Sequence, residues 1–177
     1  MKRKISVGIS QCLLGANVRY NGGNRLEGII VSELGKVFEF VHFCPEVDIG
    51  LGTPREAINL VKDENGFRLI GSRSGADITE TMKTYAASRV KELADSGVRG
   101  LIFKSKSPSC GLTGVKMFNA DGAIISETGA GLFARACVEA LPHFPVAEEI
   151  NLRDEEQRTG FIEQVCAYDK IVRRRPD

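Results

Sequence analysis

The sequence lacks the features that would send a protein to a membrane or out of the cell. No apolar run approaches the roughly 20 residues that a membrane-spanning helix needs. The opening stretch "MKRKISVGIS" has no long apolar segment followed by a cleavage site. Its five cysteines, an odd number without a secretion signal, are typical of free or metal-bound thiols in a reducing compartment. We therefore expect a cytoplasmic protein with no membrane partner.

A large net charge of either sign is also missing. The 24 lysines and arginines nearly balance 23 acidic residues, which leaves a net charge of +1 and no strong electrostatic footprint for nucleic acid. The local basic cluster Arg173–Arg175 is expected to be a solvated end rather than a binding site. No repeat or linker divides the chain, so we predict one domain over 1–177, with a core at 1–168 and a basic tail at 169–177.

Short runs rich in β-branched and aromatic residues alternate with helical patterns along the chain. The predicted strands are 4–10, 38–44, 67–71, 98–105, 123–126 and 144–149. The predicted helices are 26–37, 53–61, 77–96, 131–141 and 153–172. This alternation favours a Rossmann-like α/β fold, with a mainly parallel sheet and helices on both of its faces. Ligands of such folds bind beyond the carboxyl ends of the strands.

The cysteines fall into two groups. Cys137 and Cys166 recur at helical spacing from apolar residues, which is typical of small core residues. In contrast, Cys12, Cys44 and Cys110 each follow a predicted strand and lie beside glycine, proline or serine. The carboxyl ends of parallel strands share one edge of the sheet, so these three thiols are expected to converge there. The plainer alternative is three unrelated buried thiols.

Three converging thiolates suit a metal, but their spacing does not identify it. Zinc with three cysteines and a water is possible, as is an iron–sulfur cluster with three irons bound by the protein. An open coordination position would indicate catalysis. A non-catalytic structural metal site would instead need a fourth protein ligand. His42, two residues before Cys44, is the candidate for that role.

A dinucleotide site is a further alternative. "GAGLFA" (129–134) has the pattern G-x-G-x-x-A between a short predicted strand and a helix, and Glu148 and Glu149 follow about 20 residues later. On pattern alone this predicts an NAD-binding oxidoreductase. However, the preceding strand is very short and only one strand remains after the motif. A glycine turn that lets a helix pack on the sheet is the simpler interpretation.

Three segments resemble the thiouracil desulfidase family. They are "SQCLLGANVRYNGG" (10–23), "CPEVDIGLGTPRE" (44–56) and "KSKSPSCG" (104–111), and the later "GADITETM" and "GAGLFA" extend the likeness over nearly the whole chain. The resemblance implies a 4Fe–4S cluster with one open iron and three protein ligands, here Cys12, Cys44 and Cys110. It also implies removal of sulfur from thiouracil-type pyrimidines to give uracil and hydrogen sulfide. Members with an added C-terminal domain are associated with thiolated tRNA, so a small thiopyrimidine is expected as the substrate here.

The chemistry that this resemblance implies needs an acid–base group near the cluster. An open iron would act as a Lewis acid on the thiocarbonyl sulfur, and water would then attack the carbon with the help of a base. Glu46, two residues beyond Cys44, is predicted to be that base, the alternative being a surface glutamate that starts a turn. By the family pattern, Ser107 is predicted to orient substrate or relay a proton. Ser109 is predicted to contact substrate, the backbone or a cluster sulfide.

Two basic residues near these motifs are candidates for substrate binding. Lys104 opens the segment that ends at Cys110, and Arg19 lies seven residues beyond Cys12. Either could attract an anionic substrate or intermediate, and either could equally be a plain surface charge.

Overall fold

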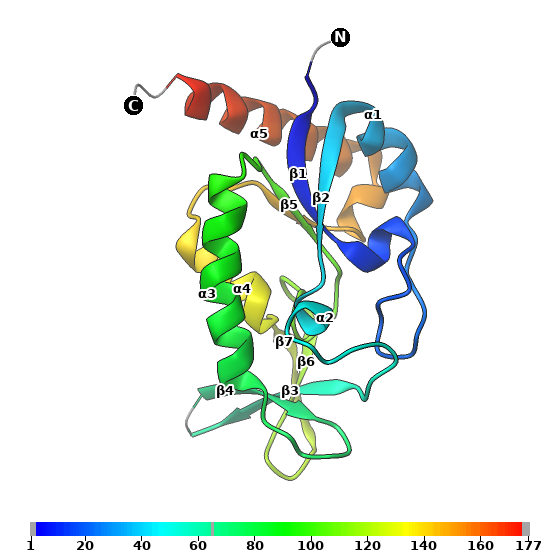
Figure 1. The fold of residues 1–177 in the computed structure, drawn as a ribbon, viewed down its shortest axis with the longest axis vertical. Helices are drawn as coiled ribbons and strands as arrows, with labels where there is room; N and C mark the ends of the chain where they lie inside the picture. Colours follow the sequence, from blue (N-terminus) through cyan, green and yellow to red (C-terminus); the bar gives the residue numbers. More distant parts are fainter. Residues whose placement is uncertain (1–2, 65, 175–177) are drawn as a thin grey trace.

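A parallel sheet forms the upper part of the molecule, seen in Figure 1 in the computed structural model, which describes residues 3–64 and 66–174. Its strands, in the spatial order β2–β1–β5–β8, are β1 (Ile5–Ser10), β2 (Phe38–Phe43), β5 (Leu101–Phe103) and β8 (Val146–Glu148). β1 pairs in parallel with β2 and β5, and β5 pairs in parallel with β8. The predicted α/β class with a parallel sheet is confirmed.

Helices cover both faces of this sheet. They are η2 (Ile30–Leu34), α1 (Gly35–Val37), α3 (Thr79–Asp95), α4 (Leu132–Ala140) and α5 (Glu155–Arg173). Successive residues of a strand point to opposite faces. Leu101 and Phe103 accordingly pack in one apolar cluster with α3 and α4, whereas Ile102 packs in another with η2 and α5. All three side chains are fully buried, as in a parallel sheet that is covered on both sides.

A second, mixed sheet lies at the other end of the molecule and was not predicted. Its strands, in the order β4–β3–β6–β7, are β3 (Ile58–Asp63), β4 (Gly66–Gly71), β6 (Val115–Phe118) and β7 (Ile124–Gly129). β3 pairs antiparallel with β4 and parallel with β6, and β6 pairs antiparallel with β7. The predicted helix 53–61 is wrong, because much of that segment forms β3. Pairing on both sides of β3 and the full burial of Leu60 outweigh the local threonine–proline start signal.

The ends of the two long helices, α3 and α5, lie close to where they were predicted. α3 begins beside Asp77, whose carboxylate accepts the Thr79 N–H at 2.9 Å, and Gly97 with φ +80° follows its end, as expected. α5 ends at Arg173, next to the predicted end at 172, and its Asp169 is buried against Arg99. Residue 175, the last of the basic cluster, lies outside the described residues. Within 3–64 and 66–174, no helix is long and apolar enough to cross a membrane.

The carboxyl ends of the parallel strands lead into short connections, three of which begin as or contain a short helix. β1 runs into η1 (Gln11–Leu14), β2 into α2 (Pro45–Asp48) and β8 into η3 (Asn151–Arg153). β5 runs into residues 104–113, which we call the cysteine loop because Cys110 lies in it. These connections carry the candidate functional residues to one edge of the sheet.

Candidate active site

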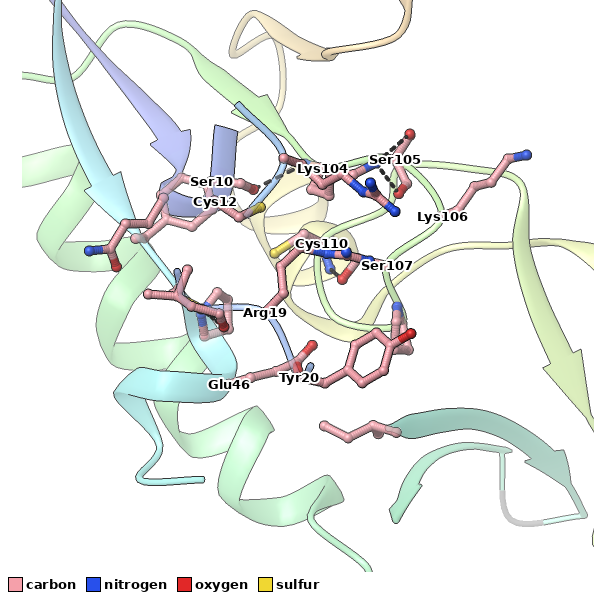
Figure 2. Close-up of a pocket in the computed structure, with 18 of the residues that line it drawn as sticks. Ser10, Cys12, Arg19, Tyr20, Glu46, Lys104, Ser105, Lys106, Ser107 and Cys110 are labelled. Atoms are coloured by element: carbon pink, nitrogen blue, oxygen red, sulfur yellow. Dashed lines mark hydrogen bonds between the residues drawn. The ribbon is translucent and has the colours of Figure 1, made fainter. Parts of the chain in front are cut away.

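A cavity of about 350 Å³ at this edge is lined by all three strand-end cysteines. Cys12 lies in η1 directly after β1, Cys44 directly follows β2, and Cys110 lies in the cysteine loop after β5. Figure 2 shows the sulfur atoms of Cys12 and Cys110 turned toward one another. The fold thus brings together three thiols that are far apart in the sequence. Cys137, by contrast, is buried in the apolar core, as its spacing predicts.

Burial keeps these thiols in the protonated form. It is the main cause that raises the pKa of Cys12 to about 11, and it also raises the pKa of Cys44. Burial and then the nearby Glu46 raise the pKa of Cys110 well above its usual range, although a hydrogen bond with Ser10 opposes the rise. Cysteine binds metal as thiolate, so a metal or cluster must displace a proton from each thiol.

The spacing of the thiols bears on the kind of metal group that they could hold. Among the described residues, no three His, Cys, Asp or Glu side chains gather closely enough to bind one ion. The sulfur ligands of a single zinc ion all lie about 2.3 Å from the metal, whereas cysteines on an iron–sulfur cluster bind different irons. His42 is exposed and is not among the described residues that line the cavity. The hypothesis that His42 completes a closed metal site is therefore wrong.

Glu46 also lines the cavity, in the first turn of α2, and both of its carboxylate oxygens have partners. Arg55 donates from Nε at 2.9 Å and from Nη2 at 2.8 Å to Oε2. Ser109 donates its hydroxyl to Oε1 at 2.9 Å. The side chains of Glu46 and Arg55 are only 15% and 7% exposed. Glu46 is thus a partly buried, fixed carboxylate rather than a surface residue at a turn.

Ser107 and Ser109, the serines on either side of Pro108 in the cysteine loop, have different positions. Ser107 lines the cavity, and its Oγ accepts the N–H groups of Cys110 at 3.0 Å and of Ser109 at 3.2 Å. Its own hydroxyl proton is not used in those two bonds. Ser109 is fully buried and lies behind Glu46, to which it donates. Of these two serines, Ser107 is therefore the one that a molecule in the cavity could meet.

Buried acids at the end of β8 hold the cysteine loop near both of its ends. Glu149, 2% exposed, accepts the Lys104 ammonium at 2.5 Å, the Ser105 N–H at 2.6 Å and the Ser105 hydroxyl at 2.7 Å. The other two bonds of the ammonium go to Ser105. Glu148, also buried, accepts the Leu112 N–H at 2.7 Å. Lys104 borders the cavity, but its three donors are all engaged in holding the loop.

Comparison with known proteins places this site in a family. Residues 7–149 match the family described as 2-thiouracil desulfurase. The chain belongs to this family. Over 151 residues it is 31% identical to the uncharacterized protein YbbK of Bacillus subtilis, an alignment that covers 82% of this chain and 97% of the relative.

A solved structure supports the same assignment for this desulfurase-family chain. The structure of the 4Fe–4S-dependent thiouracil desulfidase TudS is similar, with a TM-score of 0.62 and 26% identity. The match covers 89% of this chain and 99% of that structure. The family resemblance of the three cysteine motifs is thereby confirmed, as is the α/β fold that the alternation of strands and helices predicts.

In this desulfurase-family chain, "GAGLFA" does not form a dinucleotide site. β7, which ends at Gly129, is antiparallel to its neighbour β6 and is not part of a βαβ unit. The N–H groups of Gly131 and Phe133, at the start of α4, already donate to carbonyls of the cysteine loop at 2.8 and 3.0 Å. A Cβ atom at Gly131 would lie 2.4 Å from the carbonyl carbon of Ser109. The glycine is needed because α4 packs directly on the cysteine loop, as the simpler interpretation predicts.

The mouth of the cavity is basic and carries one aromatic ring. Arg19, Tyr20 and Arg25 line it from the loop that follows η1. The Arg19 guanidinium lies 5.4 Å from the centre of the Tyr20 ring, which is 43% exposed. Among the described residues, neither Arg19 nor Arg25 forms an ion pair. The cavity thus has an entrance suited to a planar group with negative charge.

Several residues of the site were not predicted from the sequence, among them Tyr20 and Arg25 at the mouth, together with Arg55 and Ser10. Arg55 lies in a segment that was predicted to be helical, and its partner Glu46 is nine positions away. Ser10 ends β1, where its hydroxyl accepts the Lys104 N–H at 3.0 Å. The motif that contains Arg55 was recognised as a whole, but no local pattern indicates which of its residues turns inward.

Proposed function

We propose that this protein is an iron–sulfur-dependent desulfidase that converts thiouracil-type pyrimidines to uracil and hydrogen sulfide, with Cys12, Cys44 and Cys110 holding a 4Fe–4S cluster. The observation that carries the proposal is that three thiols from three strand ends, two of them buried and that of Cys44 partly buried, line the same cavity as a fixed carboxylate, Glu46. Membership of the 2-thiouracil desulfurase family and similarity to a 4Fe–4S-dependent desulfidase support it.

The residues around the cavity fit such a cluster. Thiolates are the soft ligands that iron–sulfur clusters prefer, and no histidine is among the described residues that line the cavity. Cys12, Cys44 and Cys110 would hold the cluster, which would supply Lewis-acid chemistry toward a thiocarbonyl sulfur. Free thiols of this kind are kept in the reducing cytoplasm, which is where we place the protein.

The protein's own contribution to the reaction is proton transfer at Glu46. The reaction is a net hydrolysis, in which the oxygen of water bonds to the thiocarbonyl carbon and the carbon–sulfur bond breaks. Glu46 takes a proton from the attacking water, and the sulfur leaves with two protons as hydrogen sulfide. No oxidant or reductant is needed. Ser107, with its hydroxyl proton available at the cavity wall, hydrogen-bonds the substrate or relays a proton.

The mouth of the cavity supports a preference for substrates with negative charge. Arg19 and Arg25 border the entrance and Tyr20 offers a ring on which a pyrimidine can stack. A phosphate on a thiolated pyrimidine nucleotide would meet this basic entrance, whereas a free base would use only the inner part of the cavity. Lys104 acts in this scheme by holding the cysteine loop rather than by touching substrate.

Anaerobic purification followed by iron and sulfide analysis tests the proposal. We expect about four irons and four sulfides per chain, together with loss of the near-ultraviolet absorbance of 4-thiouracil and release of sulfide. Turnover should disappear in Cys110→Ala, which loses a ligand, and in Glu46→Ala, which loses the base. Cys137→Ala, a buried cysteine outside the cavity, is the matched control and should keep both cluster and activity. Zinc in place of iron, or a complete cluster without turnover of any thiopyrimidine, would refute the proposal.

A further inference from the structure

Arg55 has contacts that the reaction scheme above does not use. Its side chain is 7% exposed and donates twice to one oxygen of Glu46, at 2.9 and 2.8 Å. The remaining nitrogen, Nη1, donates to the Gly52 carbonyl at 2.8 Å. The backbone N–H of Arg55 donates to the Tyr20 carbonyl at 2.8 Å. The guanidinium is therefore itself fixed at several points.

Glu46 is held from a second side by a different element. Ser109, which is fully buried in the cysteine loop, donates to the other carboxylate oxygen at 2.9 Å. Because both oxygens have partners, the carboxylate is confined to few rotamers. This holds even though α2, the helix that carries Glu46, has only four residues. A guanidinium presents its N–H groups in a rigid planar fork, which fixes a carboxylate more precisely than a lysine ammonium can.

We propose that Arg55 and Ser109 are positioning residues that clamp Glu46 in the orientation from which it takes the proton of the attacking water. This inference rests on the proposed function. Neither residue needs to touch the substrate, since most Arg55 donors go to the protein and Ser109 lies behind Glu46. A displacement of the base by about 1 Å can cost a hundredfold in rate, so the clamp acts on kcat rather than on substrate affinity.

The experiment is a double-mutant cycle on the cluster-loaded enzyme. Arg55→Gln, Arg55→Lys and Ser109→Ala are each made in the wild-type protein and in Glu46→Asp. The aspartate keeps a carboxylate and a measurable rate but is one methylene too short to meet both partners. In the wild-type background we expect Arg55→Gln and Ser109→Ala to lower kcat about 10- to 100-fold with KM changed less than about threefold. Arg55→Lys keeps the charge without the fork and should be intermediate.

In the Glu46→Asp background, the same clamp substitutions should change kcat by less than about threefold, because their target is already out of place. Iron content, the visible absorbance of the cluster and the thermal midpoint are measured for every variant, and we expect the iron content and absorbance to stay at wild-type values. Equal losses in the two backgrounds would overturn the proposal, since the residues would then act independently of Glu46. A raised KM with unchanged kcat in Arg55→Gln would also overturn it, because Arg55 would then be a substrate-binding residue.

Two further measurements distinguish failure of the clamp from failure of the proposed role of Glu46. If the Arg55 variants do not fold, the cycle between Ser109→Ala and Glu46→Asp decides the proposal from the opposite side of the carboxylate. Glu46→Ala, made in parallel, tests the role of Glu46 separately from the role of the clamp. Full activity of Glu46→Ala would refute the proposed role of Glu46 in the reaction, whereas an inactive Glu46→Ala without coupling in the cycle would refute only the clamp.

Discussion

The two ends of the cysteine loop are held by buried acids, so a single isosteric substitution at Glu149 should loosen it. Glu149→Gln keeps the size of the side chain but removes its charge. The carboxylate accepts the Lys104 ammonium and both polar groups of Ser105, and it is 2% exposed. In the variant, the ammonium loses its counter-ion, and one oxygen of the carboxylate becomes an amide NH₂, which cannot accept a hydrogen bond.

The expected loss of unfolding free energy depends on how deeply the side chains of Glu149 and Lys104 are buried. Removing one partner of a fully buried ion pair costs about 3–5 kcal/mol, because the other charge is left buried. The Lys104 side chain is 20% exposed, so water can recover part of that loss. We therefore expect Glu149→Gln to lower the free energy of unfolding by about 2–4 kcal/mol. For a chain of this size, that corresponds to a fall of roughly 4–16 °C in the thermal midpoint.

The assay is thermal unfolding under anaerobic conditions, with cluster content matched between the variants because a bound cofactor itself raises the midpoint. Glu127→Gln is the matched control. Its carboxylate lies 3.5 Å from Lys116 with both side chains more than half exposed, and such surface pairs are worth at most about 1 kcal/mol. An unchanged midpoint and unchanged cluster retention in Glu149→Gln would refute the claim that this buried acid holds the loop.

Three other substitutions test separate parts of the structure. Gly131→Ala should cost about 1–3 kcal/mol in unfolding free energy and weaken cluster retention, because its Cβ would lie 2.4 Å from a backbone atom of Ser109. Stability should fall as the pH rises from about 9 toward 12, because burial raises the pKa of Cys137 to about 12 and only the unfolded thiol ionises in that range. Cys137→Ala should make this decline shallower. Arg19→Ala should raise KM for a thiolated pyrimidine nucleotide about tenfold and KM for the free base by less than about threefold, since only a phosphate meets the basic mouth.

Each of these predictions has a contradicting result. Gly160, inside α5, has open space where its Cβ would be, so Gly160→Ala is the control for Gly131→Ala and should not destabilise. Equal effects of the two substitutions would show that α4 does not pack closely on the loop. An unchanged pH slope in Cys137→Ala would contradict the assignment of the decline to that thiol. Equal changes of KM for nucleotide and base in Arg19→Ala would mean that the arginine does not meet a phosphate.

The convergence of the three cysteines could be predicted because each signal was local. A short apolar strand that ends at a cysteine in a turn is visible in the sequence, and parallel strands end at a common edge. The second sheet could not be predicted in the same way. β6 has only four residues, and β3 follows a threonine–proline pair that is typical of the start of a helix. Both segments form strands because of the strands they pair with, which the local sequence does not show.

The roles of individual polar residues were harder to predict than their presence. Glu46 was predicted from its distance to Cys44, but Arg55, which holds it, was missed because the contact joins two segments through tertiary structure. Ser107 and Ser109 are two positions apart in similar surroundings, and only the fold decides that one faces the cavity and the other is buried. Lys104 similarly reads as a free charge until β8 places Glu149 beside it.

Several hydrogen bonds from other elements of the protein hold the cysteine loop. Glu148 and Glu149, at the end of β8, accept hydrogen bonds from both ends of the loop. The carbonyls of the loop accept the first N–H groups of α4. We therefore expect the loop to keep its shape without iron, in contrast to small metal-dependent domains that fold only around their ion. Oxidative loss of the cluster would then leave a folded protein with its cysteine loop in place, and repair would need only iron and sulfide. Inactivation by air and recovery by reconstitution would form a reversible cycle that the polypeptide passes through without unfolding.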